Sequence, residues 1–296
     1  MAQHDDSFLD EGFLRRLEQL KFLARQSPRS AFKGDYSTSR SGASVEFLDY
    51  RKYQIGDDLR YVDWNVYSRL DKLFIKLFRA EKNQTVHLLL DMSRSMDFGE
   101  PAKHLVARKI AAAIGYISLT SMNYVGVTAF ADALDATNRQ AGGRQAYLPL
   151  VDYLLSLRVL EKTDINGCLA EYAATSKQRG IAVILSDLMD PGGFEHGIRA
   201  MRFARFDISL IQVLDHQELF PALNGHLVLR DMETGQVRRI IMDQALLEAY
   251  RKKIAGFIDT NREICLQNGV DYHVYDTRQS FEDFLITYVT EGTMFR

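Results

Sequence analysis

Residues 86–95 read VHLLLDMSRS, and this stretch decides the fold class. Its first half, Val86 to Leu90, is apolar apart from His87, and such a run is typical of a strand buried on both faces of a sheet. A short turn follows, and a long helical pattern opens at Pro101. Asp91 therefore falls at the carboxyl end of a central strand, the edge at which open α/β sheets bind their ligands.

The rest of the chain alternates apolar strands with helical patterns. Strands are predicted over 125–130, 181–185, 206–214 and 270–275, and helices over 102–120, 147–157, 165–178, 192–204, 243–267 and 280–290. This alternation predicts a doubly wound, mostly parallel and Rossmann-like sheet covered by helices on both faces. Residues 226–241 interrupt it and read as a β-hairpin around Glu233, Thr234 and Gly235.

Composition sets limits on the class of protein. The chain has 296 residues, enough for one large domain or two modest ones, and a formal charge of −2, which gives no footprint for nucleic acid or an anionic membrane. Cys168 and Cys265 stand in no C-x-x-C arrangement, so neither a disulfide framework nor a thiolate zinc site is expected. The acidic N-terminus lacks the apolar core of a signal peptide, and we expect a cytoplasmic protein.

One uncharged run, residues 110–131, is long enough to cross a bilayer. Polar residues interrupt it, and Asn123-Tyr124 marks a break between a helical and a strand pattern. The run is therefore predicted to be a buried helix followed by a buried strand, with no membrane span.

The chain is predicted to have three parts. An amphipathic helix lies within residues 1–26, a segment packed on the core covers 27–83, and an α/β domain covers 84–296 with a hairpin insertion over about 215–242. Residues 27–44 are rich in Ser, Arg and Gly and read as an irregular connector.

Residues 45–81 mix aromatic with charged side chains. Residues 73–79 read as a strand with one polar face, and Asp58 is placed to cap a short helix holding Asp63 and Trp64. Composition favours a packed lid whose charges form surface pairs, and a recognition surface is the alternative. The candidates for that surface are Asp57, Asp58, Arg60, Asp63, Trp64 and Arg69.

Oxygen-bearing side chains follow several of the predicted strands. Asp91, Ser93 and Ser95 follow the first, Thr163 or Asp164 leads into the helix at 165, and Asp187 follows the strand at 181–185, with Asp190 in the next turn. Because the carboxyl ends of parallel strands share one edge, these groups are expected to form a cluster suited to Mg²⁺ or Mn²⁺. The alternative is that Ser93, Ser95 and Thr163 only cap helices and that Asp187 belongs to a turn.

The spacing of these residues resembles that of a known metal-binding motif. Asp91-x-Ser93-x-Ser95, then Thr163, then Asp187 at a strand end resembles the metal-ion-dependent adhesion site of von Willebrand factor A-type domains. Residues 56–64, GDDLRYVDW, resemble the signature of a bacterial A-domain-like family of formerly unknown function that is often encoded beside MoxR-type AAA+ ATPases. The resemblance covers roughly residues 34–290. Gln54-Ile55 stand where that family more often has Arg-Pro, and the N-terminal membrane helices of many relatives have no counterpart here.

The resemblance implies a non-enzymatic role. Asp91, Ser93 and Ser95 would be near ligands of Mg²⁺ or Mn²⁺, with Thr163 and Asp187 binding directly or through water. An acidic side chain of a partner would complete the metal shell. The implied partners are a MoxR-type AAA+ ATPase and client proteins, in chaperone-like assembly or maturation of protein complexes.

A metal-dependent phosphohydrolase is the enzyme alternative. Phosphatases of the haloacid dehalogenase type place a second Asp two residues after the first as general acid, and here that position is Ser93. The sequence contains no G-x-S-x-G, P-loop or G-x-G-x-x-G motif, and its histidines show no ligand spacing. An interaction module is therefore the favoured hypothesis.

Overall fold

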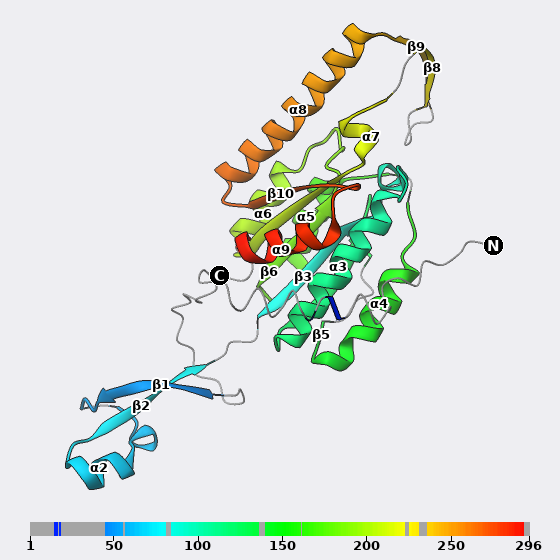
Figure 1. The fold of residues 1–296 in the computed structure, drawn as a ribbon. Helices are drawn as coiled ribbons and strands as arrows, with labels where there is room; N and C mark the ends of the chain where they lie inside the picture. The colour runs from blue at the N-terminus through cyan, green and yellow to red at the C-terminus, as the bar shows by residue number, and fades with distance from the viewer. Residues whose placement is uncertain are drawn as a thin grey trace. The chain divides into compact units, whose positions relative to one another are not determined.

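The computed structural model describes residues 15, 16, 18, 45–55, 57–80, 84–135, 140–160, 162–222, 225–230 and 236–292. The chain divides into two compact units, residues 34–83 and residues 1–33 together with 84–296 (Figure 1). Of the predicted N-terminal helix, only residues 15, 16 and 18 are described, and these are helical. The predicted connector over 27–44 lies outside the described residues.

The larger unit is built on a six-stranded sheet of described strands (Figure 1). These are β3 Thr85–Asp91, β4 Tyr124–Phe130, β5 Ala141–Gly142, β6 Ile181–Ser186, β7 Asp207–Leu214 and β10 Asp271–Asp276. Their order is β10-β7-β6-β3-β4-β5, and every pair is parallel except β4–β5. The predicted α/β class with a mostly parallel central sheet is thus confirmed.

Helices cover both faces of this sheet. They are α3 Lys103–Thr120, α4 Tyr147–Ser156, α5 Ile165–Thr175, α6 Glu195–Phe203, α7 His216–Leu219, α8 Gln244–Gln267 and α9 Phe281–Glu291. One apolar cluster joins α3, α4 and α9 to Val86, Leu88 and Leu90 of β3, and a second joins α5, α6 and α8 to Leu89. Because successive strand residues face opposite sides, the apolar residues of β3 contribute to both layers.

The order of the strands creates a switch point between β3 and β6. The chain runs from β3 to β4 on one side of the sheet and later reaches β6 on the other side of β3. Crossovers that leave in opposite directions open a crevice at the carboxyl ends of the two strands. Asp91 ends β3 and Asp187 directly follows β6, so both residues lie at this crevice.

The uncharged run at 110–131 divides as predicted. Helix α3 ends at Thr120 and β4 begins at Tyr124. Within the described part of the chain, no helix combines the length and apolarity that crossing a membrane would require.

The smaller unit differs in part from its prediction. Strand β2, Phe74–Ala80, was expected, but it pairs antiparallel with β1, Val45–Lys52, which the sequence analysis did not predict. Asp58 caps the short 3-10 helix η2, Leu59–Tyr61, whereas the next helix, α2, spans Trp64–Leu70. The prediction that Asp63 lies inside a helix is wrong, because Asp63 is the residue that caps α2.

The predicted hairpin is present. It consists of β8, Gly225–Arg230, and β9, Val237–Met242, which pair antiparallel. The predicted turn at 233–235 lies outside the described residues. Helix α8 follows directly, capped by the Asp243 side chain, which accepts a hydrogen bond from the Leu246 N–H at 2.8 Å.

His87 in the middle of β3 makes stability depend on pH. Its ring is fully buried, its Nδ1 lies 2.7 Å from the Tyr172 hydroxyl, and burial lowers its pKa to about 4. In the unfolded chain a histidine has a pKa of about 6.5. As the pH falls from 6.5 towards 4, His87 therefore binds a proton in the unfolded state but not in the folded state. The free energy of unfolding decreases over this range.

We expect this residue to cost about 2 kcal/mol of stability at pH 5 relative to pH 7. Denaturant unfolding of the wild type and of His87→Phe at both pH values measures the effect. The difference between the two pH values should be about 2 kcal/mol smaller in the variant. An identical pH dependence in the two proteins would contradict the assignment.

Candidate metal site at the carboxyl edge

Backbone hydrogen bonds hold three loops together at the carboxyl edge. The Met92 N–H donates to the Phe130 carbonyl at 2.8 Å, and the Leu160 N–H donates to the Met92 carbonyl at 2.7 Å. The Asp164 N–H donates to the Ala131 carbonyl at 2.8 Å. The loops that follow β3 and β4 and the loop that precedes α5 are thus fixed relative to one another, as the clustering of the predicted ligands requires.

Asp91 is buried and held on both carboxylate oxygens. Its Oδ1 accepts the Ser93 N–H at 2.9 Å, and its Oδ2 accepts the Ser186 hydroxyl at 2.6 Å. Ser186 in turn accepts the Leu188 N–H at 2.9 Å. A carboxylate oxygen can accept a second hydrogen bond or ligand contact, so Asp91 is oriented without being saturated.

The hydroxyls of the motif are not used as helix caps. Ser93 occupies the cap position of the 3-10 helix η3, Arg94–Asp97, but its side chain makes no capping bond, and its Oγ lies 3.1 Å from that of Ser95. Helix α5 is capped by Asp164, not by Thr163. The Thr163 hydroxyl is buried and has no hydrogen-bond partner. Ser93 and Thr163 therefore do not act as helix caps, and their hydroxyl oxygens are not occupied by capping hydrogen bonds.

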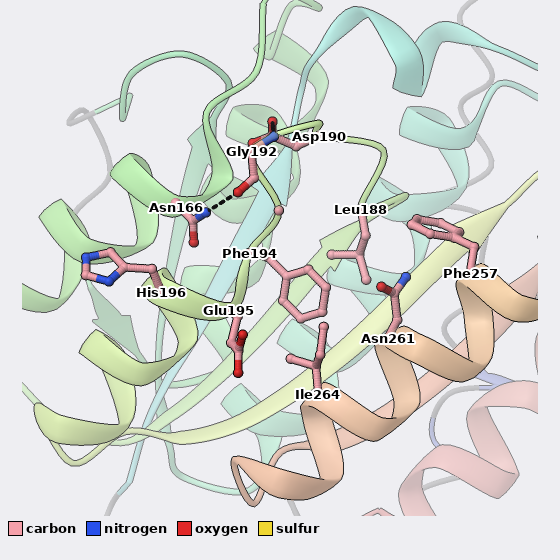
Figure 2. Close-up of a pocket in the computed structure, with 11 residues that line it drawn as sticks. Asn166, Leu188, Asp190, Gly192, Phe194, Glu195, His196, Phe257, Asn261 and Ile264 are labelled. Atoms are coloured by element: carbon pink, nitrogen blue, oxygen red, sulfur yellow. Dashed lines mark hydrogen bonds between the residues drawn. The ribbon is translucent and has the colours of Figure 1, made fainter.

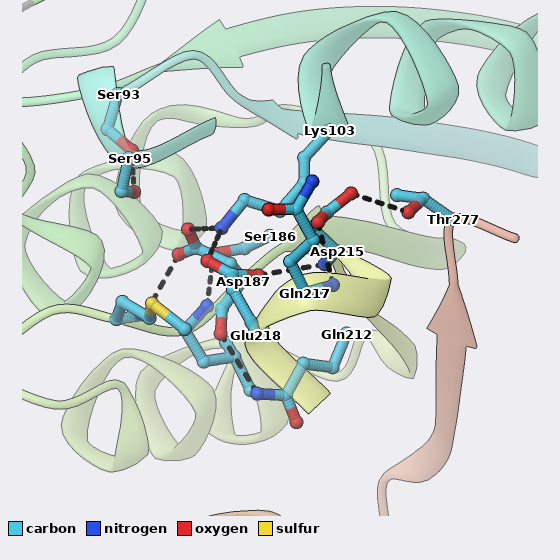
Figure 3. A network of polar contacts seen from close by, with 12 residues as sticks. Ser93, Ser95, Lys103, Ser186, Asp187, Gln212, Asp215, Gln217, Glu218 and Thr277 are labelled. Carbon is cyan, nitrogen blue, oxygen red and sulfur yellow. Dashed lines mark hydrogen bonds and ion pairs between the residues drawn. The ribbon is translucent and has the colours of Figure 1, made fainter. Parts of the chain in front are cut away.

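Asp187 belongs to a buried ion cluster that Lys103 joins to Glu218 (Figure 3). Its Oδ1 accepts the Met189 N–H at 2.9 Å, and its Oδ2 lies 2.8 Å from Lys103 Nζ. The same ammonium lies 2.6 Å from Glu218 Oε1 of α7. The Lys103 side chain is completely buried, and its ion pairs with the two carboxylates offset the hydration that the ammonium loses on burial.

The electrostatics of the edge favour a cation. Burial, followed by the negative charge of Asp187, raises the pKa of Asp91 to about 7. Burial alone would lower the pKa of Lys103, but Asp187 and Glu218 outweigh burial and raise it. Lys103 neutralises only part of the negative charge, because its one ammonium pairs with two carboxylates, those of Asp187 and Glu218. A divalent cation near Asp91 would relieve the remaining repulsion.

These side chains fit a hard divalent ion. Asp91, Ser93, Ser95, Thr163 and Asp187 offer carboxylate and hydroxyl oxygens, the donors that Mg²⁺ and Mn²⁺ prefer. In the described part of the chain, no group of three or more His, Cys, Asp or Glu side chains is placed to hold a metal. A site here must therefore use the hydroxyls, and the unpartnered Thr163 oxygen is the feature that an ion would satisfy.

Three residues of this edge were not among the predicted site residues. One is Ser186, whose hydroxyl orients Asp91. Lys103 and Glu218 were not singled out at all. One signal was readable for Lys103, since a cation in the first turn of a helix opposes the helix dipole and needs a nearby anion.

The candidates in the smaller unit divide into two groups. Asp57 lies 2.8 Å from Arg51, Asp58 pairs with Arg60 at 2.6 Å, and Asp63 accepts the Tyr50 hydroxyl at 2.8 Å. These carboxylates are thus engaged within the unit, and Asp63 links β1 to the start of α2 through Tyr50. The other two candidates, Trp64 and Arg69, are exposed. That this unit recognises a partner protein stays a prediction, and exposed side chains such as Trp64 and Arg69 would make the contact.

A pocket of about 360 Å³ lies between the loop that follows β6 and helix α8 (Figure 2). Asp190, which the sequence placed near the cluster, borders it, and its oxygens accept the Ile165 and Gly192 N–H groups at 2.9 and 2.7 Å. Asn166 is likewise paired with the Gly192 carbonyl at 2.7 Å. What the pocket presents is chiefly its apolar wall of Leu188, Phe194, Phe257 and Ile264.

Comparison with known proteins gives the family. The model of a family described as "Protein of unknown function DUF58" matches residues 49–257. The chain belongs to the DUF58 family. This DUF58 protein is 28% identical over 245 residues to an uncharacterised protein of Mycobacterium bovis, covering 81% of this chain and 77% of the relative.

Two solved structures resemble this DUF58 protein at low identity. An aerotolerance-related membrane protein from Bacteroides fragilis is 15% identical, with a TM-score of 0.45 over 71% of this chain and 100% of that one. The conserved hypothetical protein BatB from Bacteroides thetaiotaomicron is also 15% identical, with a TM-score of 0.46 over 71% of this chain and 98% of that one.

Proposed function

We propose that this DUF58 protein is a non-enzymatic, metal-dependent protein-interaction module with a von Willebrand factor A-like fold. Mg²⁺ or Mn²⁺ would be held by Asp91, Ser93 and Ser95, with Thr163 and Asp187 binding directly or through water. The observation that carries the proposal is the buried Thr163 hydroxyl without a partner, in a loop whose Asp164 N–H is bonded to the Ala131 carbonyl in the loop after β4. Two buried carboxylates, Asp91 and Asp187, lie at the switch point of the same sheet edge.

The metal would supply an open coordination position for an acidic side chain of a partner protein. A carboxylate bound in this way makes a strong, charge-assisted contact that depends on the cation. Lys103 and Ser186 would keep Asp187 and Asp91 oriented, so that the shell needs little rearrangement when the partner arrives. We propose a MoxR-type AAA+ ATPase as the partner, in chaperone-like assembly or maturation of client complexes.

We also propose that the protein works in the cytoplasm. Cys168 and Cys265 are both buried, unpaired thiols, and burial raises the pKa of each to about 12. Two reduced, unreactive cysteines suit a reducing compartment such as the cytoplasm.

A metal-dependent phosphohydrolase, the enzyme alternative, would need different features. Its nucleophilic carboxylate must be open to the substrate, whereas Asp91 is 1% exposed and both of its oxygens accept hydrogen bonds. Ser93 also stands where the general acid would be. These features support an interaction module over phosphoryl transfer.

The test uses immobilised full-length protein and a purified MoxR-type ATPase, both in constant Mg²⁺ because the ATPase itself needs the ion. Thr163→Val removes the candidate ligand and keeps the shape of the side chain. Ser118→Ala is the matched control, since Ser118 is another buried hydroxyl without a partner but lies within α3.

We expect the wild type and Ser118→Ala to retain the ATPase and Thr163→Val to bind it about tenfold more weakly. Equal retention by all three proteins would contradict the proposal. Turnover of a phosphate ester that disappears in Asp91→Ala would favour the hydrolase instead.

A further inference from the structure

The β8–β9 hairpin exposes an apolar face. Opposite residues of an antiparallel pair share a face, and the register pairs Val228 with Arg239 and His226 with Ile241. On that face Val228, Val237 and Ile241 are 66%, 59% and 61% exposed. On the other face Met242 is buried and Leu227 and Ile240 are half-buried. This second face is the more covered of the two, although its Leu229 is 43% exposed. The hairpin itself lies beside the N-terminal end of α8 (Figure 1).

The hairpin also leaves strand edges free. In the described part of the chain its sheet consists of β8 and β9 alone, so each strand has a neighbour on one side only. An edge strand with exposed β-branched side chains is a template for a further strand. Along β9, the exposed face carries Val237, Arg239 and Ile241 at alternate positions, in the order apolar, cationic, apolar.

The charge of the hairpin strands selects the partner. Strand β8 contains one arginine, β9 contains two, and neither contains an acidic residue. A strand that pairs with β9 is complementary when it carries apolar, acidic and apolar side chains at alternate positions on the same face. This pattern places a carboxylate beside Arg239 and apolar groups beside Val237 and Ile241.

We propose that the β8–β9 hairpin is a docking arm for an extended segment of a partner protein with this apolar-x-acidic-x-apolar pattern, which adds as a strand to the free edge of β9. Recognition of this kind combines backbone hydrogen bonds for affinity with alternate side chains for specificity. The proposal is independent of the metal site, because none of the hairpin residues belongs to it.

Other occupants fit the face less well. A second copy of the chain pairing through β9 about Arg239 would place two like charges directly opposite each other. Membrane-surface segments bury aromatic or leucine side chains, and single-stranded nucleic acid stacks on aromatic rings. The exposed face of the hairpin has no leucine, phenylalanine, tyrosine or tryptophan among its described residues, and its one ring is the imidazole of His226.

The test uses two fluorescent ten-residue peptides and the full-length protein. One peptide contains Val-Thr-Glu-Thr-Val, and its twin carries Lys in place of Glu. Anisotropy titrations are run with the wild type, with Arg239→Glu and with Arg205→Glu. Arg205→Glu is the control, because it reverses the charge of an exposed arginine that lies outside the hairpin, just before the amino end of β7. A parallel series in EDTA separates this surface from the metal site.

The wild type and Arg205→Glu should bind the acidic peptide about tenfold more tightly than its twin, with or without EDTA. Arg239→Glu should reverse the preference, and that reversal also shows that the variant is folded. Equal affinity for the two peptides, or an unchanged preference in Arg239→Glu, would overturn the proposal. Self-association or binding to phosphatidylglycerol vesicles that depends on Arg239, without peptide discrimination, would overturn it as well.

Discussion

Replacement of Lys103 by methionine is expected to lower the free energy of unfolding by about 3–5 kcal/mol. The ammonium is completely buried and lies 2.8 Å from Asp187 and 2.6 Å from Glu218. Methionine fills a similar volume but leaves Asp187, which is 1% exposed, without its cationic partner. Breaking a buried pair by removing one member costs much more than the net contribution of the intact pair, because the remaining charge stays desolvated.

Chemical denaturation of wild type and variant measures this loss. Lys252→Met is the matched control, because Lys252 is exposed on α8 and should change stability by less than about 0.5 kcal/mol. Neutralising one of the stranded carboxylates in Lys103→Met/Glu218→Gln should recover part of the loss. A Lys103→Met protein as stable as the wild type would show that the ion cluster does not hold this edge together.

Gly180→Ala is expected to destabilise the protein by about 3 kcal/mol. Gly180 directly precedes β6, and a Cβ at this position would lie 2.0 Å from the Thr85 carbonyl oxygen at the start of β3. The obstacle is backbone, so it cannot rotate away, and the two strands that carry Asp91 and Asp187 would have to shift. Thermal or denaturant unfolding measures the loss.

Gly256→Ala provides a control of opposite sign. Gly256 lies within α8, and nothing stands within 4 Å of the Cβ that alanine would add. Alanine in a helix interior is favoured over glycine by about 0.5–1 kcal/mol, so this variant should be slightly more stable than the wild type. If both substitutions had the same small effect, the close approach of β6 to β3 would not be a packing constraint.

The fold of the larger unit was predictable because its signals are local. Apolar runs such as residues 86–90 and 181–185 can be satisfied only by burial on both faces, and the periodic stretches between them supply the covering helices. Parallel strands then bring Asp91 and Asp187 to one edge by topology alone. For that reason the candidate site could be located from sequence before any contact was known.

The parts that were missed depend on contacts between distant residues. Strand β1 contains four charged residues among eight, and it becomes a strand because β2 pairs with it, with a bulge between Phe47 and Asp49. Lys103 meets Asp187 and Glu218 across 84 and 115 positions of sequence, and no local pattern records such meetings. Asp63 was placed inside a helix because the cap position depends on backbone conformation, and its φ and ψ of −84° and 97° are extended.

Mg²⁺-dependent stability tests most directly whether the carboxyl edge binds a divalent cation with the help of Thr163. A ligand that binds only the folded state at 100 times its Kd adds about 2.7 kcal/mol to the free energy of unfolding. Denaturant unfolding with EDTA and with Mg²⁺ would be compared for the wild type, Thr163→Val and Ser118→Ala, the two variants that each remove a buried, unpartnered hydroxyl.

We predict that Mg²⁺ stabilises the wild type and Ser118→Ala equally. Thr163→Val should be as stable as the wild type in EDTA. In Mg²⁺ it should lose at least about 1.4 kcal/mol of the stabilisation, which is equivalent to a tenfold weaker Kd. Stability that does not respond to Mg²⁺ or Mn²⁺ in any of the three proteins, or a response that Thr163→Val keeps in full, would contradict the account.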